Sequence, residues 1–155
     1  MAIRTIRTEG DEILKKKSKP VEVVDDKIRE LIKDMFDTMH KYEGVGLAAV
    51  QVGILKQIIV IDLEDEEQKY VLINPEIISQ TGEQVVEEGC LSFPNKFAKI
   101  KRPTNIKVKA LNEKGEKIEI SAKDLLAQAI AHEIDHLNGE VFIDKIIPGT
   151  LEIVK

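Results

Sequence analysis

The sequence is poor in cysteine, since its 155 residues include only one, Cys90. A single cysteine excludes an internal disulfide. In a reducing compartment such a residue is a small buried side chain, a nucleophile or a metal ligand. The sequence around Cys90 is needed to distinguish these three roles.

Tryptophan is absent, and aromatic residues make up 4% of the chain. The sequence therefore lacks an aromatic platform for stacking bases, and a net charge of −5 argues against a general nucleic-acid surface, so we expect no DNA partner. The longest apolar runs, such as Ile58–Ile61, are far too short to span a bilayer, so we expect no membrane partner. The N-terminal residues have no apolar signal core, and we expect a cytoplasmic location.

The remaining composition is that of a globular protein, with 43% hydrophobic and 33% charged residues. A chain of this length can bury one sizeable core, so we expect a single catalytic domain over residues 1–155.

Helical periodicity appears in two places. Apolar residues recur at helical spacing after Asp25 and Asp26, which predicts an amphipathic helix from about 26 to 41. Ser121, with Asp124 three residues later, resembles a capping box and predicts a helix that runs to about Asn138. Gly139 is placed to end this helix.

Strand patterns fill most of the chain between and after these helices. We expect strands at 57–63, 70–74, 83–88, 97–101, 106–110, 118–120 and 141–146, with a hairpin turn at 112–115 and a loop around Cys90. Strands that dominate beside two well-separated helices predict an α+β fold with antiparallel β-sheets. We expect the sheets to pack around a central C-terminal helix that binds metal, with a second helix near the N-terminus.

The predicted C-terminal helix contains His132-Glu133-Ile134-Asp135-His136. Histidines at positions i and i+4 lie on one helical face, so both rings can reach one metal ion, and Glu133 lies close enough to act on a water there. One buried histidine is more often a core residue with a hydrogen bond. Two histidines that flank a glutamate favour a metal site.

A catalytic metal site needs a third protein ligand. His40 is the only other histidine, and we expect it at the surface near the end of the first helix. Cys90 is the better candidate because glycine and proline bound its segment, although an inert buried cysteine is the common alternative. A thiolate ligand suits ferrous iron as well as zinc.

Glycines punctuate the stretch Gly44–Gly53, which can be a loop between helix and strand. A phosphate-binding role is disfavoured because no Lys-Ser/Thr pair follows and no strand precedes it. Gln51 is a polar residue among small apolar ones, and its amide could donate to a developing oxyanion.

Together these segments resemble the peptide deformylase family. The chain matches that family's three signatures in order, as GxGxAAxQ at 44–51, EGCLS at 88–92 and HExDH at 132–136, and Lys101-Arg102-Pro103 follows the cysteine segment as in the family. The likeness covers nearly the whole chain. Departures from the family pattern fall at Val50, Gln128 and Ala131 and affect no expected ligand.

The resemblance implies removal of the formyl group from the N-terminal formyl-methionine of nascent polypeptides. It implies one divalent metal held by Cys90, His132 and His136, expected to be Fe²⁺ with Zn²⁺, Ni²⁺ or Co²⁺ as substitutes. Glu133 would be the general base and then the general acid, while Gln51 and the backbone N–H of Leu91 would stabilise the oxyanion. Substrate-binding residues would be Val45, Gly46, Val86, Glu88, Gly89, Leu125 and Ala129. We also expect a monomer with a transient ribosome contact.

Two other functions stay open at this point. Another small HExxH metallopeptidase or metalloamidase would take its third ligand downstream of His136, where only Glu140, Asp144 and Glu152 are available. A non-catalytic structural metal-binding module would close its site with four protein ligands, whereas only three are apparent.

Overall fold

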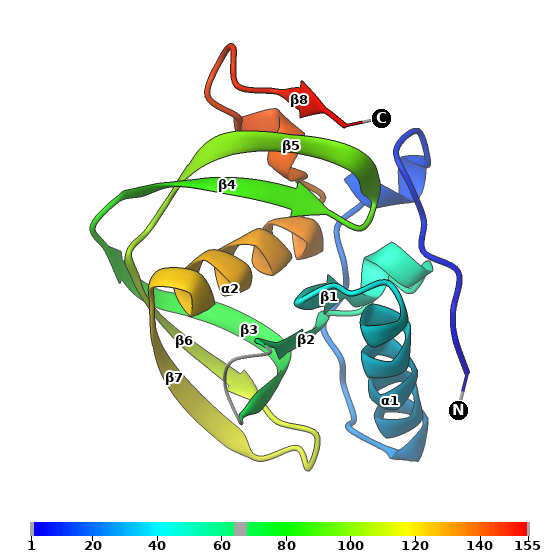
Figure 1. Ribbon diagram of the computed structural model, residues 1–155. Helices are drawn as coiled ribbons and strands as arrows, with labels where there is room; N and C mark the ends of the chain where they lie inside the picture. The colour runs from blue at the N-terminus through cyan, green and yellow to red at the C-terminus, as the bar shows by residue number, and fades with distance from the viewer. Residues whose placement is uncertain (1, 64–67, 155) are drawn as a thin grey trace.

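The computed structural model describes residues 2–63 and 68–154 and shows an α+β fold of two helices and two antiparallel sheets (Figure 1). The helices are α1 (Asp26–Lys41) and α2 (Asp124–Leu137). The five-stranded sheet has the order β1 (Gly46–Ala48), β2 (Ile58–Asp62), β3 (Lys69–Thr81), β6 (Asn105–Leu111), β7 (Lys117–Lys123). The three-stranded sheet has the order β4 (Gln84–Cys90), β5 (Phe93–Arg102), β8 (Glu152–Ile153). The predicted α+β class with antiparallel sheets is confirmed.

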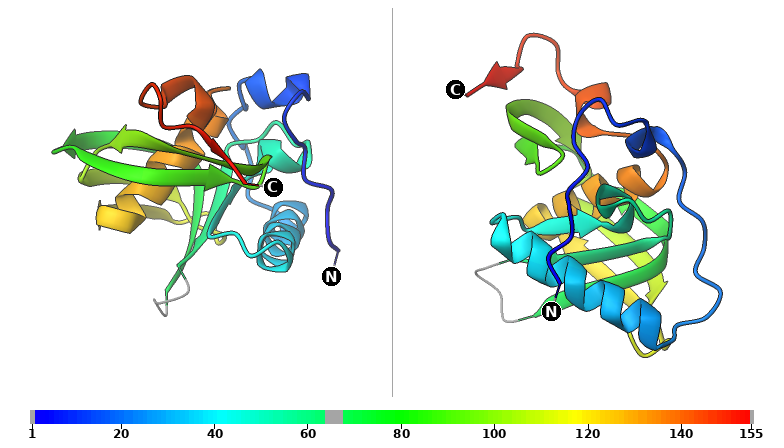
Figure 2. Two further views of the ribbon diagram at one scale, coloured as in Figure 1. Left: turned by 45° about the horizontal axis from the view of Figure 1, so that its top comes forward. Right: turned by 90° about the vertical axis from the view of Figure 1, so that its right-hand side faces the viewer.

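The run of four apolar residues in β2 is buried on both faces of the five-stranded sheet. Ile58 and Val60 pack with α1, whereas Ile59 and Ile61 pack in the cluster that contains α2. A strand that is covered on both faces is apolar at successive positions, whereas a half-exposed strand alternates apolar and polar residues. The five-stranded sheet therefore separates α1 from α2, and Figures 1 and 2 show α2 between this sheet and strands β4 and β5.

Helix α1 has the predicted bounds. The Asp25 side chain accepts a hydrogen bond from the backbone N–H of Ile28 at 3.0 Å, which caps the first turn. The N-terminal segment crosses this helix, and Arg4 binds the buried carboxylate of Asp34 through two guanidinium nitrogens (Figure 2). These contacts fix the segment that leads to the cavity described below.

Helix α2 begins differently from the prediction. Ser121 lies in β7, where it pairs with Lys107, so the predicted capping box does not form. The helix starts at Asp124, directly after β7 ends at Lys123, and no side chain caps it. Asp124 adopts a φ of 51°, and its N–H donates to the carbonyl of Thr104. The chain therefore passes from strand to helix without a loop.

Other elements also differ from expectation, and β1 and β8 are strands that were not predicted. The predicted strand at 141–146 is a short 3₁₀ helix at Phe142–Lys145. The strand predicted at 70–74 extends to Thr81, because a register shift between Ile73 and Glu76 accommodates Pro75 inside β3. Cys90 is the last residue of β4 rather than part of a loop.

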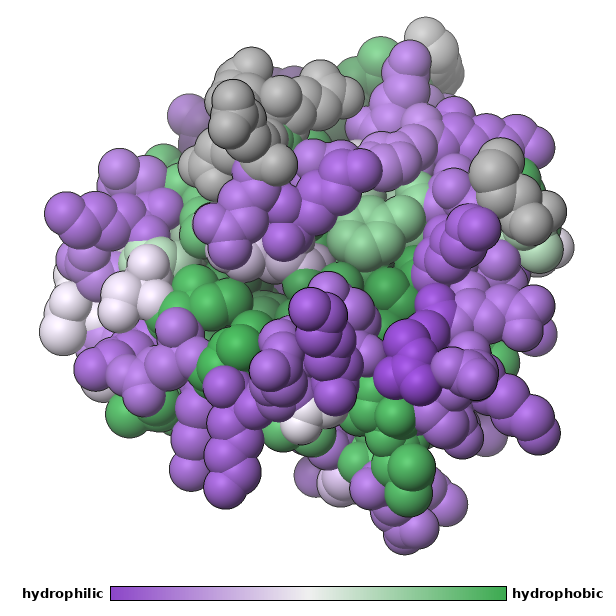
Figure 3. Space-filling view, turned by 90° about the horizontal axis from the view of Figure 1, so that it is seen from below, coloured by the Kyte–Doolittle hydropathy of each residue, from purple (hydrophilic) through white to green (hydrophobic). Residues whose placement is uncertain are grey.

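No helix in the described residues is both long and apolar enough to cross a membrane. On the face shown in Figure 3, hydrophilic side chains separate the apolar patches.

Candidate active site

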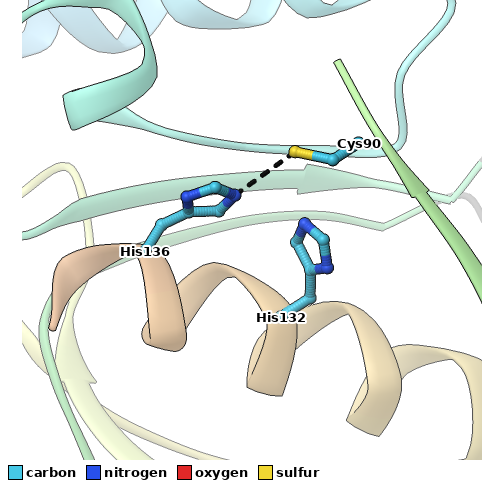
Figure 4. Close-up of side chains that lie close together, drawn as sticks. All are labelled: Cys90, His132 and His136. Atoms are coloured by element: carbon cyan, nitrogen blue, oxygen red, sulfur yellow. Dashed lines mark hydrogen bonds between the residues drawn. The ribbon is translucent and has the colours of Figure 1, made fainter. Parts of the chain in front are cut away.

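Cys90 at the end of β4 meets two histidines from α2. The Sγ atom of Cys90 lies 3.4 Å from Nε2 of His136, and one potential ligand atom from each of Cys90, His132 and His136 lies within 4.8 Å of the others. Figure 4 shows both rings rising from successive turns of α2 on the side that faces the cysteine. The helix supplies the spacing of the histidines, and the three-stranded sheet supplies the cysteine.

This donor set fits a divalent metal ion. One thiol and two imidazoles are soft to intermediate donors that suit zinc, iron, nickel or cobalt. Three protein donors leave a coordination position for water or substrate, as catalytic sites require. His40 is not near this group, because it is half-exposed and binds Asp62.

A buried chain of charged groups orients His132. Its Nδ1 lies 2.7 Å from a carboxylate oxygen of Glu88, which leaves Nε2 free to face the other donors. Arg102 holds the same carboxylate with two hydrogen bonds of 2.7 and 2.8 Å, and its third nitrogen donates to Asp135 at 2.6 Å. A second partner that orients a metal-binding histidine raises its metal affinity. Arg102 and Lys145 are thus the partners of Asp135 in the HExDH motif.

These contacts set the charge of Glu88. Burial alone would raise the pKa of its carboxyl, but the hydrogen bonds from Arg102 and His132 outweigh burial and lower this pKa to about 2. Glu88 lines the cavity, as expected of a substrate-binding residue, yet its carboxylate is committed to Arg102 and His132. Glu88 is therefore an ionised group that orients the ring of His132.

Glu133 is buried next to the three donors, and Oε1 of its carboxylate has no hydrogen-bond partner among the described residues. Burial raises the pKa of Glu133 to about 7, although His132 opposes this shift. A carboxyl group with such a pKa can both accept and donate a proton near neutrality. Gly46 makes room for it, because a Cβ atom at residue 46 would lie only 2.7 Å from Oε2 of Glu133.

The side-chain amide of Gln51 is held in one orientation. Its Oε1 accepts a hydrogen bond from the N–H of Ala48 at 2.9 Å, and its Nε2 lies 3.1 Å from Oγ of Ser92 and 3.5 Å from Sγ of Cys90. The donor end of the amide therefore points toward the thiol and the hydroxyl of Ser92. Sequence reasoning did not single out Ser92, although it lies two residues from Cys90 in the same motif.

A cavity of about 870 Å³ opens over these groups. The expected site residues that line it, besides Gln51, Cys90, His132 and Glu133, are Val45, Gly46, Glu88, Gly89, Leu91, Leu125 and Ala129. Gln128 also lines it, and its side-chain amide donates to the carbonyl of Glu87. Val45 and Leu125 are large apolar residues that remain 42% and 53% exposed, which is consistent with a surface that a ligand covers.

Two expected residues lie outside this lining. Val86 pairs with Ile100 across β4 and β5 and packs against the core cluster under β5. His136 is fully buried beneath the cavity. Val86 is therefore not part of the described cavity lining, and its contact with substrate stays a prediction.

The cavity wall includes residues that sequence reasoning missed. Thr5, Ile6 and Thr8 come from the N-terminal segment, and Phe93 and Phe97 come from β5. None of them lies in a motif, so only the folded chain reveals them. Phe97 crosses β4 at Gly89, where a Cβ atom would lie 2.7 Å from its ring.

Comparison with known proteins gives a consistent result. The family model described as polypeptide deformylase matches residues 3–151. The chain belongs to the polypeptide deformylase family. It is 58% identical over 146 residues to peptide deformylase 1 of Clostridium acetobutylicum, which covers 94% of this chain and 96% of that protein.

Solved structures of the family share the fold. The peptide deformylase of Thermotoga maritima has a TM-score of 0.92 at 43% identity and covers 96% of this chain and 100% of its own. The peptide deformylase of Legionella pneumophila has a TM-score of 0.91 at 47% identity, with coverage of 95% and 88%. Deformylases are metal-dependent hydrolases, and the donor set around Cys90 agrees with membership of this family.

Proposed function

We propose that this chain is a peptide deformylase, which removes the formyl group from the N-terminal formyl-methionine of newly made polypeptides and releases formate. One observation carries the proposal: Cys90, His132 and His136 bring three metal-binding atoms together beside the buried carboxylate of Glu133. The reaction, deformylation, is inferred from the family to which residues 3–151 belong. We further propose that residues 1–155 make one catalytic domain in which α2 is the central metal-binding helix.

Cys90, His132 and His136 would hold one divalent ion. We propose Fe²⁺, as the resemblance to peptide deformylases implies, and Zn²⁺, Ni²⁺ or Co²⁺ would substitute, because one thiolate and two imidazoles suit each of these ions. When bound, such an ion supplies a Lewis acid that makes water more acidic and polarises a carbonyl group.

The surrounding residues would handle the proton and the negative charge. Glu133 accepts the proton of the water that attacks the formyl carbon, and it later returns that proton to the leaving amine. Nε2 of Gln51 and the N–H of Leu91 donate hydrogen bonds to the oxyanion of the tetrahedral adduct. The orientation of the Gln51 amide supports this role, because Ala48 holds its oxygen end away. Loss of one such donor typically costs about 10²–10³ in rate.

The geometry of the cavity suits an extended peptide. Strand β1 is at one edge of the five-stranded sheet, strand β4 is at one edge of the three-stranded sheet, and both line the cavity. Peptides commonly bind by adding a strand to such an edge, and backbone pairing does not depend on sequence. Val45, Leu125 and Ala129 offer apolar contacts for the methionine side chain, while Gly46 and Gly89 leave the backbone accessible.

We propose that the enzyme acts as a cytoplasmic monomer with a transient ribosome contact. One chain supplies every residue of the proposed site, so catalysis needs no second subunit. The substrate is a nascent polypeptide, which is available where proteins are synthesised.

The decisive experiment measures formate release from a short formyl-methionyl peptide. The protein is purified without oxygen in the presence of iron, and a nickel-loaded sample serves as a more robust form. We expect turnover with both metals, and a fully loaded protein without turnover would contradict the proposal.

Two variants separate this function from its alternatives. Glu133→Ala should retain its metal and lose turnover, whereas a structural metal site would be insensitive to this change. Cys90→Ala should lose the metal, whereas a metallopeptidase with a ligand downstream of His136 would keep it. Both variants are compared by metal analysis and by formate release.

A further inference from the structure

The third histidine of the chain, His40, belongs to a contact that the catalytic residues do not explain. It lies in the last turn of α1, and its Nε2 is 2.6 Å from Oδ2 of Asp62 at the end of β2. The ring of His40 stacks on Phe36 with centroids 6.1 Å apart, and Lys69 lies 4.0 Å from the same carboxylate oxygen. The side chain of Asp62 is 15% exposed, so this contact is partly shielded from water.

The rim segment, defined as residues 42–46, leads from the end of α1 into the first residue of β1, and all five of its residues line the cavity. Its backbone touches the proposed machinery on two sides. A Cβ atom at residue 44 would lie 2.6 Å from Cδ1 of Leu91, and one at residue 46 would lie 2.7 Å from Oε2 of Glu133. A small shift of the rim segment would therefore change the shape of the cavity next to both residues.

The rim segment needs an external restraint. Glu43 adopts a φ of 59°, which is uncommon for a residue with a side chain. The N–H groups of Glu43 and Gly44 donate to the last carbonyls of α1, so the segment is held at its start through the helix end. At its other end, the N–H of Asp62 donates to the carbonyl of Val45 at 2.9 Å.

Asp62 thus contacts the end of α1 that leads into the rim segment, through its side chain at His40, and the rim segment itself, through its backbone at Val45. We propose that His40 and Asp62 are positioning residues that clamp the rim segment in the place where it receives the peptide substrate. This inference rests on the proposed function. It gives the third histidine a role in substrate binding without any contact to the substrate.

The variants His40→Ala and Asp62→Asn test the clamp. The KM for a formyl-methionyl peptide should rise about five- to tenfold, as expected for one misplaced hydrogen bond, while kcat changes less than twofold. Metal content should not change. His40→Gln retains an N–H donor and should restore KM at least in part, and a His40→Ala, Asp62→Asn double variant should be no worse than either single variant.

Lys107→Ala is the matched control, because it removes an exposed ion pair to Glu119 of 2.9 Å on β6 and β7, at the far end of the sheet from β1. Its KM should equal that of the unaltered enzyme. An unchanged KM in His40→Ala and Asp62→Asn overturns the proposal, even if their melting temperatures fall, because a purely structural contact would lower stability alone.

Amide hydrogen exchange tests the clamp independently of enzyme activity. The amides of Glu43 and Gly44 should exchange faster in His40→Ala than in the unaltered chain, and Lys107→Ala should leave them unchanged. Absence of formate release by the unaltered, metal-loaded enzyme would refute the deformylase function, and unchanged exchange would refute the clamp independently.

Discussion

Helices α1 and α2 pack on opposite faces of the five-stranded sheet, but they bury different chemistry. The inward face of α1 is mainly apolar, with Met35 and Met39 fully buried. The inward face of α2 also carries His132, Glu133 and His136, of which His132 depends on Glu88 from another sheet. An apolar face is stabilised by any neighbour of suitable shape, whereas a buried polar face needs specific partners.

Removal of the central partner on the α2 side should have the largest effect. Arg102→Met leaves the carboxylate of Glu88 without its cation and leaves Asp135 with Lys145 alone, and a broken buried ion pair typically costs about 3–5 kcal/mol. Metal affinity should also fall about 10- to 100-fold, because Glu88 orients His132. Urea unfolding and metal titration measure the two effects.

The matched control for this change lies on α1. Arg29→Met removes an exposed pair with Asp26 and two exposed hydrogen bonds to the carbonyls of Val24 and Glu113, and it should change the free energy of unfolding by at most about 1 kcal/mol. Equal stability losses in the two variants would show that the α2 side has no special dependence on its ion pairs.

A substitution that leaves an empty space in the core beside α1 should lower the stability of the fold and leave the metal site unchanged. Met35→Ala removes a fully buried side chain and should cost about 2–5 kcal/mol of unfolding free energy. Metal affinity and kcat of the folded fraction should not change, because Met35 lies across the sheet from the metal-binding residues. A weaker metal site in this variant would mean that the two sides are not independent.

The smallest expected difference concerns how the helices begin. Asp25→Ala removes the cap of α1 and should cost about 1 kcal/mol. Ser121→Ala should cost at most about 0.5 kcal/mol, because Ser121 is an exposed strand residue and caps nothing. Thermal or urea unfolding of both variants measures this contrast, and an equal loss would restore the capping-box interpretation of Ser121.

The same contrast explains which elements the sequence could predict. The bounds of α1 follow from one capping aspartate and a helical apolar period, both local signals. Ser121 has the right local pattern for a cap, but pairing with Lys107 places it in β7. Local chemistry alone cannot show which of these two alternatives gains more from the rest of the fold.

The candidate site shows a similar division. The i, i+4 spacing of His132 and His136 predicts their shared face, and α2 bears this out. The partners of Asp135 could not be named, because Arg102 and Lys145 reach it from β5 and from the 3₁₀ helix after α2. The resemblance places Val86 in the pocket, whereas the cavity lining as described leaves it out and includes Glu88 two residues further along β4.

The direct passage from Lys123 in β7 to Asp124 in α2 has a consequence for how the chain can vary in length. Each residue added to a helix turns all later residues by about 100°, and this junction has no loop that could absorb an insertion. One extra residue between Lys123 and His132 would therefore rotate both histidines away from Cys90. Insertions should be tolerated at the hairpin turn around Gly115 and excluded at this junction.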